Sequence, residues 1–177
     1  MTKLERYAAF LRGVSPMNAK MSELKACFES AGFSDVKTLL SSGNVVFGAR
    51  SQSEKALETK AEAAMQKQLG KSFLTIVRAV EELGQLIDDD PFGSYRLPKA
   101  AKRVVSFLRE APKAKLALPV EKDGARILEL RERVVLTAYV PSPRGAVFMN
   151  LIEKTFGEAV TTRTWDTVCK IVAREGA

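Results

Sequence analysis

The residues of this chain that are best suited to chemistry are arginines, lysines, asparagines, serines and glycines near predicted turns in its first quarter. Basic side chains and the free backbone N–H groups at a helix N-terminus both favour anions such as phosphate. The candidate anion-binding residues are Arg12, Gly13, Asn18, Lys20, Ser42, Gly43 and Asn44. A simpler interpretation gives such residues structural roles, with Ser22 capping a helix, Ser42 in a turn and Arg12 as a surface cation.

Arg163 is a further candidate for the same site because it precedes a predicted helix. A cation is unfavourable beside the positive end of a helix dipole unless an anion shares the position. Trp165, two residues later, fits the apolar stripe of that helix and is predicted to belong to the core.

Hydrophobic spacing predicts that the first half of the chain folds as strand, helix, two strands, helix and strand. The predicted strands cover residues 4–12, 36–40, 44–47 and 73–78, and the predicted helices cover 22–31 and 53–69. This is the order of the split βαβ, or ferredoxin-like, unit, whose antiparallel strands lie in the order 4-1-3-2. The end of the first strand then lies beside the start of the third, so residues 12–13 should approach residues 42–44.

The second half of the chain is expected to repeat this order with shorter elements. Its predicted strands are 103–109, 126–130, 134–140 and 160–162, and its predicted helices are 112–116, 146–156 and 165–174. A short helix near 80–87 and the stretch 88–94, where three aspartates precede proline and glycine, are predicted to connect the halves. We therefore expect an α+β protein of two ferredoxin-like (βαββαβ) halves with antiparallel sheets and a C-terminal helix, divided into 1–79, a connecting segment 80–100, and a basic part 101–177.

Positive charge is concentrated in the second half. The net charge of the chain is +7; residues 1–98 hold 13 Lys or Arg against 12 Asp or Glu, and residues 99–177 hold 15 against 9. This asymmetry is compatible with a polyanion partner, or with a solvated basic surface that binds nothing. If the partner is RNA, aromatic and basic residues of two neighbouring strands would form the stacking surface. The RNA-binding candidates are Arg103, Phe107, Arg109, Arg133 and Tyr139.

Several classes of site are excluded by composition. The chain has no histidine, which removes Ser-His-Asp and Cys-His catalytic systems and every histidine-ligated metal site. Its two cysteines, Cys27 and Cys169, lack the spacing of a redox or zinc motif. No phosphate-binding loop or dinucleotide fingerprint is present, so no metal and no cofactor are expected. No apolar run reaches the roughly 20 residues of a membrane span, and a cytoplasmic location is the expectation.

Several short motifs distributed along the chain resemble those of a known family. They are Phe10–Val14, Met21–Leu24, Ala31–Phe33, Ser42–Phe47 and Thr161–Val168. The sequence resembles the bacterial domain of unknown function 1697 family over nearly its whole length. The resemblance implies two ferredoxin-like subdomains and no established activity. The family usually has a glycine-rich loop after Arg-Gly, whereas this chain has Pro16, which removes a backbone donor.

These observations leave the molecular function open. The favoured hypothesis is a module that binds an anion (a nucleotide, a phosphorylated ligand or RNA) or mediates protein interactions. The alternative is a small enzyme acting on a phosphorylated or nucleotide ligand at Arg12 and Asn44, although no general base or nucleophile is evident beside them. No membrane partner is expected, and self-association into a homo-oligomer is compatible with the sequence.

Overall fold

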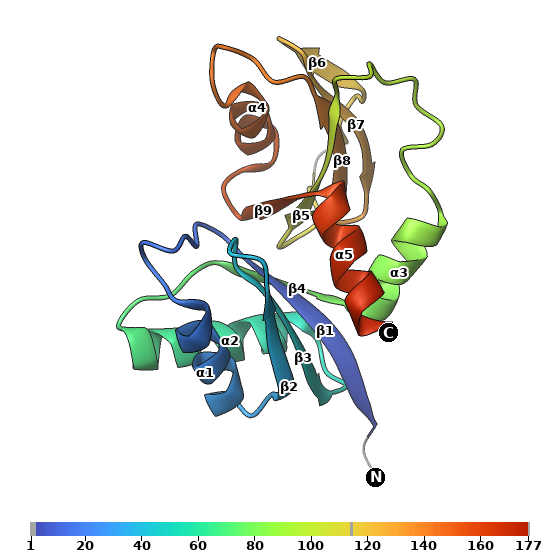
Figure 1. Cartoon of the computed structure of the whole chain (residues 1–177). Coiled ribbons are helices and arrows are strands. Elements are labelled where there is room, and N and C mark those ends of the chain that lie inside the picture. Colours follow the sequence, from blue (N-terminus) through green and yellow to red (C-terminus); the bar gives the residue numbers. More distant parts are fainter. Residues whose placement is uncertain (1–2, 114, 177) are drawn as a thin grey trace. The chain divides into compact units, whose positions relative to one another are not determined.

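The computed structural model describes residues 3–113 and 115–176 (Figure 1). Its contacts divide the chain into two compact units, one of residues 86–169 and one that joins residues up to 85 with those from 170 onwards. Five helices and two antiparallel sheets, of 4 and 5 strands, confirm the predicted α+β class across the described residues. None of the helices in this part of the chain has the length and apolar character needed to cross a membrane.

The first unit contains a four-stranded sheet in the order β2-β3-β1-β4. Its strands are β1 (Leu4–Leu11), β2 (Ser34–Leu39), β3 (Asn44–Arg50) and β4 (Thr75–Ala79). Helix α1 (Met21–Ser30) links β1 to β2, helix α2 (Glu54–Leu69) links β3 to β4, and α3 (Val80–Asp88) follows β4. The predicted element order and strand order of this half are both found, including β1 as an interior strand.

One face of this sheet forms the main core of the unit against α1 and α2 (Figure 1). Alternate residues of β1 and β3 point to this face, as the period of a strand requires. The Phe47 ring is central to it, with ring centroids 5.8 Å from Tyr7, 5.6 Å from Phe28 and 4.3 Å from Phe33. Burying each such ring stabilises the fold by roughly 1.5–3 kcal/mol relative to exposing it.

Two glutamates four residues apart on α2 accept hydrogen bonds from backbone N–H groups at the outer edge of β4. The carboxylate Oε2 of Glu58 accepts the Val77 N–H at 2.9 Å, and Oε2 of Glu62 accepts the Thr75 N–H at 3.2 Å. Glu58 is 2% exposed, so its bond lies out of water. Backbone donors on an edge strand otherwise face solvent or invite another chain to pair. The helix that covers the core therefore also closes this edge of the sheet.

A third glutamate of the same row, Glu54, pairs with an arginine of β4. Arg78 is only 2% exposed, and its Nη1 lies 3.5 Å from Oε2 of Glu54. Nη1 also donates to the carbonyl of Val77 at 2.9 Å. A buried cation is tolerated only when it is paired and hydrogen-bonded. Three consecutive turns of α2 thus present an acceptor to β4.

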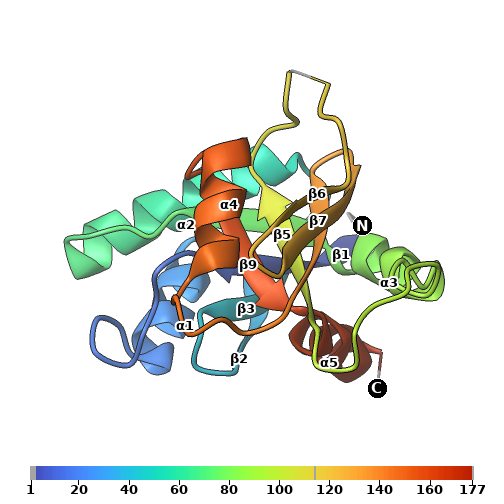
Figure 2. The same cartoon turned by 90° about the horizontal axis from the view of Figure 1, so that it is seen from above.

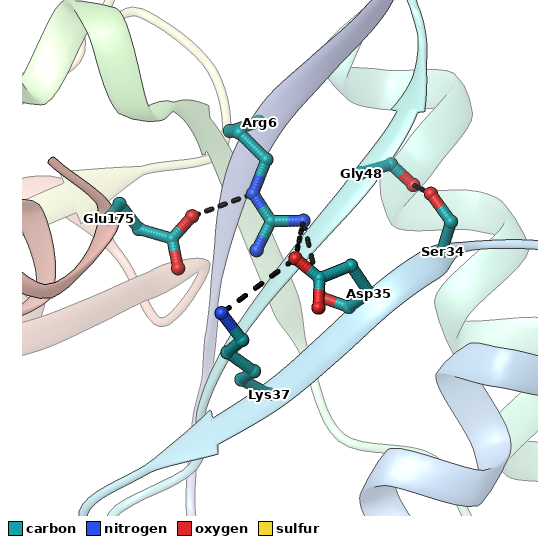
Figure 3. Close-up of polar contacts among 6 residues, drawn as sticks. All are labelled: Arg6, Ser34, Asp35, Lys37, Gly48 and Glu175. Atoms are coloured by element: carbon teal, nitrogen blue, oxygen red, sulfur yellow. Dashed lines mark hydrogen bonds and ion pairs between the residues drawn. The ribbon is translucent and has the colours of Figure 1, made fainter. Parts of the chain in front are cut away.

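Helix α5 (Trp165–Glu175) reaches the first unit at its C-terminal end, where Arg6 of β1 contacts it (Figure 3). Nε of Arg6 donates to Oε2 of Glu175 at 2.6 Å, and the Glu175 side chain is 6% exposed. Nη1 of Arg6 donates to the Asp35 carbonyl at 3.1 Å and lies 3.4 Å from its carboxylate. Lys37 also pairs with Asp35, at 3.7 Å. Arg6 therefore ties the end of α5 to the start of β2.

The second unit contains a five-stranded sheet in the order β6-β7-β8-β5-β9. Its strands are β5 (Lys102–Leu108), β6 (Val120–Lys122), β7 (Ala125–Arg131), β8 (Val134–Tyr139) and β9 (Val160–Thr164). Helix α4 (Val147–Phe156) packs across one face of this sheet, with Leu151 and Ile152 in the core (Figures 1 and 2). Trp165, at the start of α5, is buried as predicted.

One prediction for the second half, the helix at 112–116, is wrong. Described residues 112, 113, 115 and 116 are not helical; the segment instead leads to β6, an edge strand that the sequence did not indicate. Pro112 and Pro119 disfavour a helix because proline lacks an N–H and restricts the residue before it. The stretch 88–94 lies between α3 and β5, and one of its residues packs into the second unit. Phe92 is 3% exposed and packs edge-on against Trp165, with ring centroids 5.3 Å apart.

Replacing Glu58 tests the closure of the β4 edge. Glu58→Leu leaves the buried Val77 N–H without its acceptor, so we expect the free energy of unfolding to fall by about 2 kcal/mol. Glu58→Gln retains an acceptor oxygen and should cost less. Urea denaturation measures both, with the exposed position Gln66→Leu on the same helix as the control. A loss in Glu58→Leu no larger than in the control would contradict this role.

Removing the Glu175 carboxylate should loosen the end of α5. We expect Glu175→Ala to lower the free energy of unfolding by only about 1 kcal/mol, because Arg6 is partly solvated. Amide hydrogen exchange should become faster at residues 171–176 and remain unchanged in α1. Glu29→Ala, an exposed glutamate on α1, serves as the control. Unchanged exchange in α5 would show that the contact does not anchor the helix.

Candidate functional site

The first predicted cluster, called here the Arg12 edge (residues 12–20 and 41–44), comes together at one end of the first sheet. Phe10 pairs with Asn44 across β1 and β3, and the Leu11 N–H donates to the Gly43 carbonyl at 2.9 Å. The structure therefore places residues 12–13 beside residues 42–44, as the strand order required. Arg12 is half-buried, whereas Lys20 and Ser42 are exposed.

The two asparagines of the Arg12 edge hold its loops in place. Oδ1 of Asn18 accepts the Ser15 N–H at 2.9 Å, and its Nδ2 donates to the Gly13 carbonyl at 2.7 Å. Asn44 is 1% exposed, and its Nδ2 donates to the Leu39 carbonyl and to Oγ of Ser42, both at 3.0 Å. These amide groups support a structural role for both residues.

The glycines of the Arg12 edge are required by the backbone. Gly43 has φ +82°, and a Cβ added there would lie 2.9 Å from Cβ of Val14. Gly13 also has a positive φ, of +80°. Only glycine adopts this region without strain, so their presence needs no ligand to explain it.

Lysines add to the positive charge of this edge, and one of them was missed from the sequence. Nζ of Lys71, in the segment between α2 and β4, donates to the Asn18 carbonyl. Lys20, and not Ser22, is the N-cap of α1, and its N–H donates to Oε2 of Glu23 at 3.2 Å. The Glu23 carboxylate thus occupies part of the helix N-terminus that a ligand anion was expected to use.

Arg163 lies in the second unit, on β9, where it pairs with Val105 of β5. It is 8% exposed, and its Nη1 donates to the Thr162 carbonyl at 2.9 Å. Burial lowers the pKa of Arg163 to about 10, so the guanidinium remains charged at neutral pH.

The predicted RNA-binding residues do not form one aromatic surface. Phe107 pairs with Val134 and Tyr139 pairs with Lys102, so the two rings lie on opposite faces of the sheet. Phe107 is fully buried, and Tyr139 stacks on Phe148 of α4 with centroids 4.2 Å apart.

The arginines of this predicted set make local contacts within the second unit. The Arg103 guanidinium lies 5.9 Å from the centre of the Phe92 ring. Nη1 of Arg133 donates to the Arg109 carbonyl at 3.5 Å, a long bond beside the turn between β7 and β8.

A groove between β6 and α4 is a concave site that the sequence did not reveal. It has a volume of about 550 Å³. Its lining comes from two short segments, Val120, Glu121, Lys122 and Asp123 on one side and Val147, Asn150, Leu151, Lys154 and Thr155 on the other. A second hollow of about 190 Å³ lies beside it, lined partly by the same Asp123 and Val147. We call the larger one the β6–α4 groove.

The floor of the β6–α4 groove is apolar and its rim is polar. Val120 and Leu151 pack into the core of the second unit. Lys122 pairs with Ala125 and Val120 with Ile127, both core residues beneath α4, so these β6 side chains lie on the α4 face. Strand alternation places Glu121 on the other face.

Four charged residues line the groove: Glu121 and Asp123 are acidic, and Lys122 and Lys154 are basic. Within residues 3–113 and 115–176, neither Lys122 nor Lys154 makes an ion pair or a side-chain hydrogen bond. Asp123, by contrast, lies 3.8 Å from Nη1 of Arg144. Across the same residues, no three acidic or cysteine side chains gather in a way that could hold a metal ion.

Comparisons with known proteins identify the family and the fold. The model of proteins of unknown function designated DUF1697 matches residues 4–135. The solved structure of conserved bacterial protein SP0830 from Streptococcus pneumoniae is similar, with a TM-score of 0.70 and 19% identity over 99% of this chain and 100% of that one. No curated protein matches significantly. Because the family model spans most of the sequence, the chain belongs to the DUF1697 family of proteins of unknown function.

Proposed function

We propose that this protein is a binding module whose ligand occupies the β6–α4 groove. The observation that carries the proposal is the groove itself, a hollow of about 550 Å³ with an apolar floor and a few polar groups at its rim. Sites that bind ligands are typically concave, mostly apolar and lined by a small number of oriented polar groups. An interaction module was one of the functions expected from the sequence.

The groove lining supports binding more than catalysis. Its one hydroxyl side chain, Thr155, donates to the Leu151 carbonyl at 2.7 Å within α4. A nucleophile for covalent catalysis instead needs a neighbouring base that accepts its proton. Asp123 is directed to Arg144 by their ion pair. These contacts give the groove a shape and a charge, but no nucleophile activated by a base.

We place the protein in the cytoplasm as part of this proposal. Cys27 and Cys169 are both free thiols in the structure, which fits a reducing compartment. RNA binding by the basic second half and self-association remain predictions.

Filling the groove tests the proposed function. Asn150 is exposed on the groove face of α4, so Asn150→Trp should block the site without disturbing the core. We expect a mixture of capped tripeptides at millimolar concentration to shift the amide resonances of residues 120–123 and 147–155, and the variant to abolish these shifts. Gln68→Trp, which replaces an exposed amide on α2, is the matched control. Peptides that shift no groove resonance, or shift them equally in Asn150→Trp, would refute the proposal.

The Arg12 edge is a second candidate site, for a phosphorylated ligand or nucleotide. It is favoured by the convergence of Arg12 and Lys20, from the loop between β1 and α1, with Lys71, from the segment between α2 and β4, at one end of the sheet close to Gly13 and Gly43. The same edge would serve the alternative hypothesis of a small enzyme, which would require a general base from elsewhere in the chain.

Removing one cation tests the Arg12 edge. If a fluorescent nucleotide analogue binds there, Arg12→Ala should weaken it about tenfold, the loss expected for one charge-assisted hydrogen bond. Anisotropy titrations at about 50 and about 200 mM salt should show weaker binding at the higher salt, because surface charges are then more strongly screened. Lys55→Ala, an exposed lysine of α2, is the charge-matched control. Equal affinity in both variants would remove this site from consideration.

A further inference from the structure

We propose that the occupant of the β6–α4 groove is an extended, acidic segment of a partner protein, which adds as a further strand beside β6. This inference rests on the proposed function, since it requires that the groove binds a ligand. It specifies the backbone conformation and the charge of that ligand.

The position of β6 in the sheet provides the backbone groups for such a strand. It is the outermost strand of its sheet and pairs only with β7 among the described strands. Alternate backbone N–H and C=O groups of an edge strand point away from the sheet and can pair with an added chain.

Helix α4 provides the opposite wall at a matching length. Val147, Asn150, Leu151 and Lys154 are spaced as one face of a helix, and all line the groove. At 1.5 Å per residue, this face extends about 10 Å. Three residues of extended chain, at about 3.3 Å each, cover the same length. Strand β6 also has three residues, so a short extended segment fits between the two walls.

The charge of the groove favours an acidic segment. Lys122 and Lys154 come from opposite walls and have no side-chain partner in the described part of the chain. Asp123 is paired with Arg144. Glu121 also lines the groove, but strand alternation places its side chain on the face of the sheet away from α4. A segment that alternates carboxylate and apolar residues would place the carboxylates near the lysines and the apolar side chains over Val120 and Leu151. Exposed ion pairs contribute little affinity each, so charge is expected to set selectivity more than strength.

Three capped hexapeptides test this inference. The first alternates Glu with Val, the second alternates Lys with Val, and the third is the Glu–Val peptide with alternate backbone amides methylated. We expect the Glu–Val peptide to bind with a Kd below 1 mM and at least fivefold more tightly than the Lys–Val peptide. We expect backbone methylation to abolish binding, because it removes the donors that pair with β6. Amide resonance shifts in β6 and α4 report where each peptide binds.

A charge reversal provides the sharper test. The double variant Lys122→Glu and Lys154→Glu should reverse the preference between the Glu–Val and Lys–Val peptides. The control, Lys25→Glu and Lys67→Glu, makes the same change in net charge at exposed positions of α1 and α2 and should leave the preference intact. Equal binding of the two peptides, or full binding of the methylated one, would overturn the inference. The binding function itself would survive if other peptides still bind in the groove and are blocked by Asn150→Trp.

Discussion

The fold of the first unit depends on which groups accept hydrogen bonds from the backbone N–H groups at the outer edge of β4. Its backbone donors lie beside α2, out of reach of another strand, and carboxylates of Glu58 and Glu62 accept them. An unpaired buried backbone donor costs about as much as a lost hydrogen bond, or more. The glutamates therefore allow α2 to lie close to the sheet, where Leu57, Ala61 and Met65 complete the core around Phe47.

The second sheet differs from the first at its edge strand β6, and the function proposed for the second unit rests on that difference. Strand β6 has only three residues and carries Glu121 and Lys122, which limits indiscriminate pairing. Its helix, α4, packs on the sheet face through Leu151 and Ile152 and leaves a hollow beside the strand. A closed edge stabilises the first unit, whereas the edge strand β6 next to a helix is where we propose that the second unit binds an extended chain.

Much of the first unit was predictable because its signals are local. The alternation in β1, the apolar spacing in α1 and α2, and the turn at Ser42 and Gly43 all lie within single elements or adjacent ones. The meeting of residues 12–13 with 42–44 then followed from strand order. The structural role of this contact could not be predicted from the sequence. Only the structure shows that the Asn18 and Asn44 amides donate hydrogen bonds to nearby backbone carbonyls.

The sequence by itself determined the α+β class, the strand order of the first sheet, the absence of histidine chemistry and the family. Only the tertiary structure decided that β6 forms, that the Phe107 and Tyr139 rings lie on opposite faces of the sheet, and that a groove lies between β6 and α4. A register shift of one residue moves a side chain to the other face of a sheet, and nothing in local hydrophobicity specifies that shift. A strand of three residues likewise has too few positions to show a period, so its existence depends on pairing with β7.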